Sequence, residues 1–287
     1  MRECEVWRVE SLEFKERETE MNRKSKTIWI VAVVLVLLAG AGIGGYLAAK
    51  KLIRHENLQD AAITELQGEI EYLESKLARV TDYYNFQAEY REDTYNYLAL
   101  GNSLTLITSW GRGICSTKPD NDYFHLVKAG LEEKHGETAA YPVQFSEWER
   151  LGNRSKAYDL IDSYLDGKLD LVTIQLGENV TDTSTYEADL EKLIRHIQEK
   201  ASKAKIVVIG DFWDKGRNES RKDAAEKTGA QFADLAGIIG DKSYQSKAGT
   251  VCELADGGTI TVTEASATHP GDEGMRYIAD RVLEAIQ

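Results

Sequence analysis

The chain has 287 residues, 42% of them hydrophobic, which is enough for one or two domains with a sizeable core. Its formal net charge of −13 argues against nucleic acid as a partner. The three cysteines, Cys4, Cys115 and Cys252, show neither a metal-ligand spacing nor a C-x-x-C pair, so we expect no zinc site and predict no other metal or cofactor.

The first organised stretch is an uncharged run of 23 residues, Thr27 to Ala49. At about 1.5 Å per residue, a helix of this length crosses the roughly 30 Å hydrocarbon layer of a membrane. We therefore predict a transmembrane helix over residues 27–49. A cleaved signal peptide is the alternative, with Ala39-Gly40-Ala41 as its small-residue site. The apolar run continues through Leu47 without a polar break, which favours an uncleaved anchor.

Positive charge is denser before the predicted span than after it. This bias favours a cytoplasmic segment over residues 1–26 and a body outside the cell, as in a single-pass protein of the cell membrane. We also hypothesise that Met21 is the true start, because Lys15-Glu16-Arg17-Glu18 would be encoded by purine-rich codons of the kind found in a ribosome-binding site.

Residues 50–91 are predicted to form a helical stalk. Apolar residues recur in steps of three and four from Ile63 to Tyr84, with Glu, Gln and Lys between them. Such a seam is typical either of a parallel coiled coil, which would make a homodimer through the stalk, or of a helix that lies on its own domain. Gly40 and Gly44, four residues apart in the span, also permit close helix approach.

From residue 92 to residue 287, strand-like apolar runs alternate with helix patterns. The predicted strands are 97–100, 141–145, 169–176, 206–209 and 230–235, and the predicted helices lie near 123–127, 157–165, 186–201, 219–227 and 272–286. Residues 240–263 indicate an irregular or hairpin-like segment. Regular alternation of this kind predicts one α/β domain built on a doubly wound, five-stranded parallel sheet.

Three polar residues stand where chemistry is expected in such a fold, because the carboxyl ends of parallel strands share one edge. Ser103 follows the first predicted strand, Asn179 follows the third, and His269 precedes the last helix. A serine needs a base to become a nucleophile, and His269 is the histidine at this edge. The backbone N–H of Ser103 and the amide of Asn179 could stabilise an oxyanion. Singly, a helix cap, a turn residue and a loop histidine would explain them; together they predict an active site.

These residues resemble the motifs of the SGNH hydrolases, also called the GDSL esterase/lipase family, over residues 95–287. Leu100-Gly101-Asn102-Ser103-Leu104-Thr105 is similar to the first block, with Asn102 where aspartate is usual. Gly177-Glu178-Asn179 is similar to the G-x-N of the third block, and His269-Pro270 to the histidine block. The resemblance implies a flavodoxin-like three-layer sandwich, Ser103 as nucleophile, His269 as general base, and an oxyanion site at Asn179 and Gly177.

The chain departs from this family in two places. The last block usually reads Asp-x-x-His, but Ser266 stands three residues before His269. Either a Ser-His dyad operates with a backbone carbonyl orienting the imidazole, or another acid such as Glu264 does so. The oxyanion glycine of the second block has no clean counterpart, and Ser146, after the second strand, is our candidate for that position.

Further aromatic residues and cysteines leave alternatives open. Trp110, Trp148 and Trp213 could line a sugar-binding cleft or cover the core. Cys115 and Cys252 could form a disulfide, which export would permit.

We expect a membrane-anchored esterase that removes O-acyl groups, such as acetyl, from cell-surface or extracellular carbohydrate through an acyl-enzyme. A lipid esterase, an acyltransferase and a non-catalytic module that binds glycan or a partner are the alternatives.

Overall fold

The computed structural model describes residues 66–70, 72 and 88–287. The chain divides into two units, Met1–Ile70 and Glu71–Gln287, and the described part of the first unit, residues 66–70, is helical. The predicted segment 1–26, the predicted span 27–49 and most of the predicted stalk 50–91 lie outside the described residues. Among the residues that are described, no helix is both long and apolar enough to cross a membrane.

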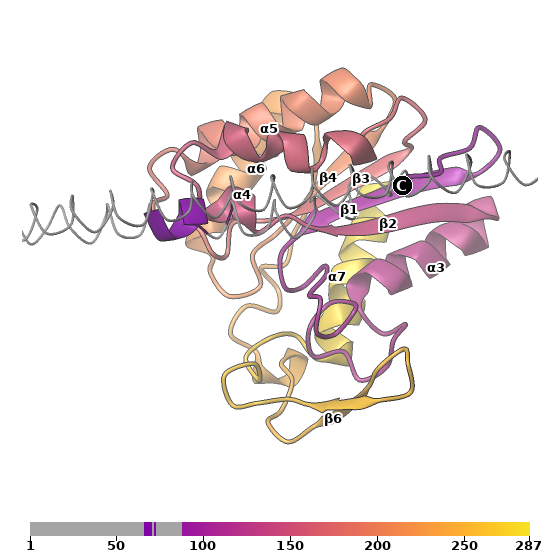
Figure 1. The fold of residues 1–287 in the computed structure, drawn as a ribbon, viewed down its shortest axis with the longest axis vertical. Coiled ribbons are helices and arrows are strands. Elements are labelled where there is room, and N and C mark those ends of the chain that lie inside the picture. The colour runs from indigo at the N-terminus through magenta and orange to yellow at the C-terminus, as the bar shows by residue number, and fades with distance from the viewer. Residues whose placement is uncertain (1–65, 71, 73–87) are drawn as a thin grey trace, which may run out of the picture. The chain divides into compact units, whose positions relative to one another are not determined.

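The second unit is built on a five-stranded parallel sheet with the strand order β2-β1-β3-β4-β5 (Figure 1). Its strands are β1 (Tyr95–Gly101), β2 (Thr138–Gln144), β3 (Leu171–Gln175), β4 (Lys205–Ile209) and β5 (Gln231–Ala233). The last residue of β1, Gly101, pairs with Gln144 on one side and Gln175 on the other. The predicted α/β class and the five-stranded parallel sheet are confirmed. The strand order reverses direction between β1 and β3, and ligands of such sheets bind at the carboxyl ends beside that point.

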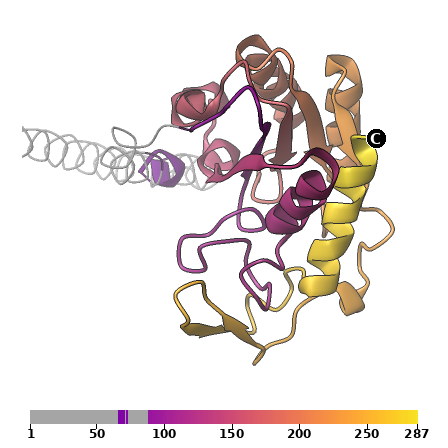
Figure 2. The same ribbon diagram turned by 90° about the vertical axis from the view of Figure 1, so that its right-hand side faces the viewer.

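Helices cover both faces of the sheet and make the second unit three layers deep (Figures 1 and 2). One face carries α4 (Glu147–Arg150), the 3-10 helices η1 (Arg154–Leu160) and η2 (Asp162–Tyr164), α5 (Tyr186–Lys200) and α6 (Gly216–Thr228). The other face carries α3 (Tyr123–His135) and α7 (Asp272–Ala285), which lie side by side, magenta and yellow in Figure 2.

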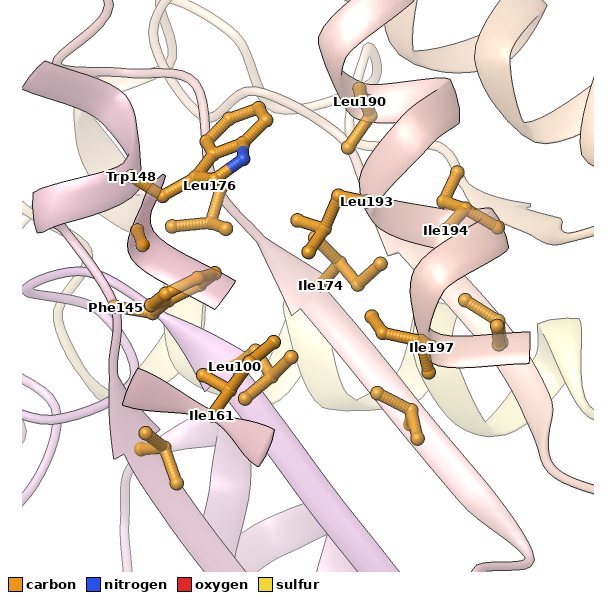
Figure 3. Close-up of a cluster of buried hydrophobic side chains, with 14 of the residues drawn as sticks. Leu100, Phe145, Trp148, Ile161, Ile174, Leu176, Leu190, Leu193, Ile194 and Ile197 are labelled. Carbon is orange, nitrogen blue, oxygen red and sulfur yellow. The ribbon is translucent and has the colours of Figure 1, made fainter. Parts of the chain in front are cut away.

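The core on the first face shows why the sequence folds this way. In α5, Leu190, Leu193, Ile194 and Ile197 recur at helical spacing and are fully buried against the sheet (Figure 3). Every residue of β3 is buried, as expected for a central parallel strand covered on both faces. Burial on this scale, at roughly 25 cal/mol per Å² of apolar surface, is what holds the layers together.

Two segments differ from or refine the sequence prediction. The predicted helix at 157–165 is instead the pair of 3-10 helices η1 and η2. In η1 the buried residues Arg154, Ala157 and Leu160 are spaced by three, which matches the three residues per turn of a 3-10 helix. Residues 240–263 hold η3 (Lys242–Tyr244) and an antiparallel hairpin of β6 (Val251–Glu253) and β7 (Thr259–Thr261).

Candidate active site

Ser103 lies in the turn that follows β1, at the carboxyl edge of the sheet. A side chain on Gly101 would come within 1.9 Å of Thr105 Oγ1 and 2.9 Å of the carbonyl oxygen of Gln175, so this position requires glycine. The N–H groups of Thr105 and Leu106 both donate to the carbonyl of Asn102 at 3.0 Å, which closes the turn around Ser103. Ser103 is half-buried, and neither its N–H nor its hydroxyl makes a hydrogen bond to any described residue. Both groups are therefore available to a ligand.

His269 lies in the loop before α7, and its ring is fixed on one side. Its Nδ1 lies 3.0 Å from the carbonyl oxygen of Ser266. Because a carbonyl only accepts, Nδ1 carries the proton, and Nε2 of the neutral ring is a free base. Burial lowers the pKa of His269, while the hydrogen bond to Ser266 and the charge of Glu178 oppose this shift. The ring of half-buried Trp213 meets that of His269 edge-on, with centroids 5.3 Å apart.

Two consecutive residues connect the serine turn to the histidine loop. The N–H of Ile114 donates to the carbonyl of Ser103 at 2.9 Å, and Sγ of Cys115 donates to the carbonyl of Ser266 at 3.3 Å. The structure therefore brings Ser103 and His269 to the same edge of the sheet. No hydrogen bond joins the Ser103 hydroxyl to the imidazole among the described residues, and in unliganded sites this contact often tightens only with substrate.

The group that orients His269 is the main chain of Ser266. Its hydroxyl is turned away and bonds to Thr263, accepting from the Thr263 N–H at 2.9 Å. Glu264 is exposed, and no hydrogen bond or ion pair joins it to His269. Of the two alternatives left open by the sequence, the geometry matches a backbone carbonyl as the orienting group.

Asn179 and Gly177 follow β3, and both donate hydrogen bonds to the carboxylate of Glu149, which the sequence pattern does not mark as a site residue. Asn179 Nδ2 donates to Glu149 Oε2 at 2.7 Å, which uses one of its two amide hydrogens. The N–H of Gly177 donates to Glu149 Oε1 at 2.5 Å and is thus directed to the carboxylate. Gly177 has a φ of 129°, and a side chain there would lie 2.2 Å from the hydroxyl of Tyr186.

Ser146 stands between β2 and α4, at the N-cap position of this short helix. The N–H of Phe145 donates to the carbonyl of Gly101 at 2.6 Å, so the end of β2 lies against the end of β1. Ser146 Oγ accepts a hydrogen bond from Gln144 Nε2 at 3.3 Å. Its role as a second oxyanion donor stays a prediction.

A buried charged cluster that the sequence pattern does not predict lies next to the serine turn. Asn102 Nδ2 donates to Glu149 at 3.1 Å and to Glu178 at 2.8 Å. Fully buried Arg221 pairs with Glu178 at 2.9 Å and with buried Asp211 at 3.5 Å. The signals in the sequence are the amide of Asn102 beside the predicted nucleophile and Glu149 within the apolar surroundings of Phe145 and Trp148. Nothing in the polar pattern of α6 marks Arg221 as buried.

The tryptophans and cysteines that the sequence left open occupy different positions in the fold. Trp148 is fully buried in the core and Trp110 is 94% buried, whereas half-buried Trp213 contacts the ring of His269. Cys115 and Cys252 are buried free thiols, not a disulfide, and burial raises the pKa of Cys115 to about 11. Within the described residues, no group of three or more His, Cys, Asp or Glu side chains could hold a metal ion.

No protein-family model matches the sequence, and no curated protein matches it. Among solved structures, an acetylxylan esterase from Geobacillus stearothermophilus is 18% identical with a TM-score of 0.44, and the match covers 68% of this chain and 96% of that one. Phospholipase A1 from Streptomyces albidoflavus is 15% identical with a TM-score of 0.42, over 67% of this chain and 99% of that one. A protein named as a GDSL-like lipase from Parabacteroides merdae is 16% identical with a TM-score of 0.44, over 70% and 98%. The esterase and lipase classes named by the sequence resemblance are thus among the solved structures to which this chain is similar.

Proposed function

We propose that this chain is a serine esterase in which Ser103 is the nucleophile and His269 the general base. The observation that carries the proposal is the hydrogen bond from His269 Nδ1 to the carbonyl of Ser266. It leaves Nε2 unprotonated at the same sheet edge as a serine whose hydroxyl is available. Burial lowers the pKa of His269, which favours the neutral ring that a general base requires.

The reaction follows from these groups. His269 Nε2 takes the proton of the Ser103 hydroxyl as the oxygen attacks the ester carbonyl carbon. The oxyanion is held by the N–H of Ser103 and the second amide hydrogen of Asn179. The alcohol leaves with the proton from His269, and Ser103 carries the acyl group as an ester. Water then attacks this ester with the same base, releasing the carboxylic acid and free Ser103.

A dyad of this kind lacks a carboxylate bonded to the imidazole. The carbonyl of Ser266 holds the tautomer but bears no full charge, so it stabilises the transient imidazolium less than an aspartate would. The negative charge of Glu178 raises the pKa of His269 and so also stabilises the imidazolium, as the charge of an aspartate would. We therefore expect a functional but slower enzyme than a complete triad would give.

The substrate we propose is an O-acetyl ester on carbohydrate at the cell surface or outside the cell. The uncharged run 27–49 supports a membrane anchor with the esterase domain outside. Half-buried Trp213 beside His269 offers an aromatic surface on which a sugar ring can stack. A homodimer through the stalk fits the heptad seam of residues 63–84 and belongs to the same proposal.

The test uses the full chain purified in detergent. We expect hydrolysis of p-nitrophenyl acetate, labelling by a fluorophosphonate probe, and release of acetate from acetylated xylan or acetylated peptidoglycan. Ser103→Ala abolishes all three, whereas Ser109→Ala, an exposed serine in the same loop, leaves them unchanged. If the wild type neither hydrolyses the ester nor reacts with the probe, the proposed serine-hydrolase function is wrong, and a non-catalytic binding module becomes the hypothesis to test.

Product analysis separates the remaining alternatives. Adding a soluble sugar as acceptor would divert the acyl group to the sugar if the chain is an acyltransferase, while an esterase continues to release free acid. Phospholipid vesicles replace the glycan to test a lipid ester as substrate.

A further inference from the structure

The buried charged cluster is not evenly neutralised. Arg221 pairs with Glu178 and Asp211, and Arg217 also pairs with Asp211 at 2.7 Å. Glu149, 98% buried, has no cation partner among the described residues. A buried carboxylate without a cation is costly, so its contacts must offset a large desolvation penalty.

All of the groups bonded to Glu149 are amide donors. Oε1 accepts from the N–H groups of Gly177 at 2.5 Å and Asn179 at 3.2 Å, and Oε2 accepts from Asn179 Nδ2 at 2.7 Å. Asn102 Nδ2 donates to both oxygens, at 3.1 and 3.4 Å. A protonated carboxyl would face one of these donors with its own hydrogen, so the arrangement fits the ionised form. Burial and the nearby Glu178 raise the pKa of Glu149, and the bonds from Asn179 and Gly177 oppose that shift.

We propose that Glu149 is a positioning residue for the oxyanion site: it fixes the loop Gly177–Asn179 and one amide hydrogen of Asn179, so that the other hydrogen is presented to the oxyanion. This inference rests on the proposed esterase function. Glu149 does not touch the reacting atoms and acts through Asn179.

Asn102 is the partner that this arrangement requires. Its amide lies between Glu149 and Glu178 and donates to both. An aspartate at position 102 would place a third negative charge against the carboxylates of Glu149 and Glu178. In this chain the carboxylate stands on α4 at position 149, and the position before the nucleophile is a neutral donor.

The first test is a double-mutant cycle between positions 149 and 179, measured as kcat and KM for p-nitrophenyl acetate. In Glu149→Gln one carboxylate oxygen becomes an NH₂ group, so either Asn179 or Gly177 loses its acceptor. We expect kcat to fall by about 10²- to 10³-fold, the cost of losing one oxyanion donor, with KM changed less than about threefold. Asn179→Ala should give a similar loss, and Glu149→Gln with Asn179→Ala should be no worse than Asn179→Ala alone.

The matched control is Glu147→Gln, which makes the same chemical change at another buried glutamate of α4 and should leave kcat unchanged. Multiplicative losses in the double mutant would overturn the proposal, because two independent groups would then be acting. An active wild type with an equally active Glu149→Gln variant would overturn it as well, whereas an inactive wild type would overturn the proposed function instead.

The second test separates positioning from folding and does not depend on Glu149→Gln being stable alone. Asn102→Asp should lower the urea midpoint, since the carboxylates at positions 102, 149 and 178 then lie together. Asn102→Asp combined with Glu149→Gln should restore the midpoint, because position 149 then carries a neutral amide and only two carboxylates remain. The pair should not regain kcat, because either Asn179 Nδ2 or the N–H of Gly177 still lacks its acceptor at position 149. Recovery of both stability and kcat would show that Glu149 is only structural, and an Asn102→Asp variant as stable as the wild type would refute the charge argument.

Discussion

His269 donates from Nδ1 to the backbone carbonyl of Ser266, 3.0 Å away, and the side chain of Ser266 takes no part. We therefore expect Ser266→Ala to keep kcat/KM within about threefold of the wild type, the range typical of a surface substitution. Glu264→Gln should be equally neutral, while His269→Ala should lower kcat/KM by at least about 10³-fold. Steady-state ester hydrolysis measures all three. A collapse in Glu264→Gln would make that carboxylate the orienting group.

The pH dependence should follow from the lowered pKa of His269. Activity needs the neutral ring, so kcat/KM should stay high as the pH falls through 6.5 and decline only around the lower pKa of the folded protein. In the unfolded chain His269 takes up a proton near pH 6.5, whereas in the folded chain it does so only at its lower pKa. Between pH 6.5 and the folded pKa, the unfolded state therefore binds more protons, and the histidine's contribution to stability falls as the pH decreases. Below the folded pKa this contribution no longer changes. NMR titration of the His269 ring measures the pKa directly, and a midpoint above 6.5 would contradict the expectation.

Gly177→Ala should destabilise the domain. The residue has a φ of 129°, and its added methyl group would lie 2.2 Å from the Tyr186 hydroxyl and 2.7 Å from an Arg221 nitrogen. Backbone strain alone costs about 1–3 kcal/mol, and the clash adds to it. Urea unfolding measures the loss. Gly167→Ala is the control, because a methyl group there meets nothing within 4 Å; equal midpoints for the two variants would refute the argument.

Arg221→Met should be the most damaging single change in the cluster. It removes the cation of Glu178 and one of the two cations of Asp211, and breaking a buried ion pair in this way typically costs about 3–5 kcal/mol. Lys222→Met, at the neighbouring exposed position of α6, should be nearly neutral. Comparison of the two urea midpoints checks this, and a small loss for Arg221→Met would mean that the carboxylates are neutralised in another way.

The layered fold could be predicted because its strands are nearly all apolar and its helices alternate with them. The run Ile206 to Ile209 reads directly as a strand covered on both faces, and it is β4. The positions of Ser103 after β1 and Asn179 after β3 follow from that alternation, since parallel strands share their carboxyl ends. His269 follows no strand of the five-stranded sheet and lies in the loop before α7.

The charged cluster could not be predicted in the same way. Hydrophobic periodicity marks apolar residues as buried, but Glu149 and Arg221 are polar residues whose burial depends on partners far away in the sequence. The group that orients His269 could not be predicted from the sequence for a related reason: every residue has a backbone carbonyl, so residue types do not indicate which carbonyl accepts the bond. The 3-10 geometry of η1 also escaped, because buried residues three apart fit either helix type over so short a segment.

The bond between Cys115 and Ser266 joins positions 151 residues apart. Closing so long a loop costs conformational entropy, although this cost grows only slowly with loop length. Cys115 is thus joined to the loop of His269 only when these distant segments have come together. The proposed esterase activity should therefore disappear together with the sheet in denaturant, and an earlier loss would identify the histidine loop as a separately unfolding unit.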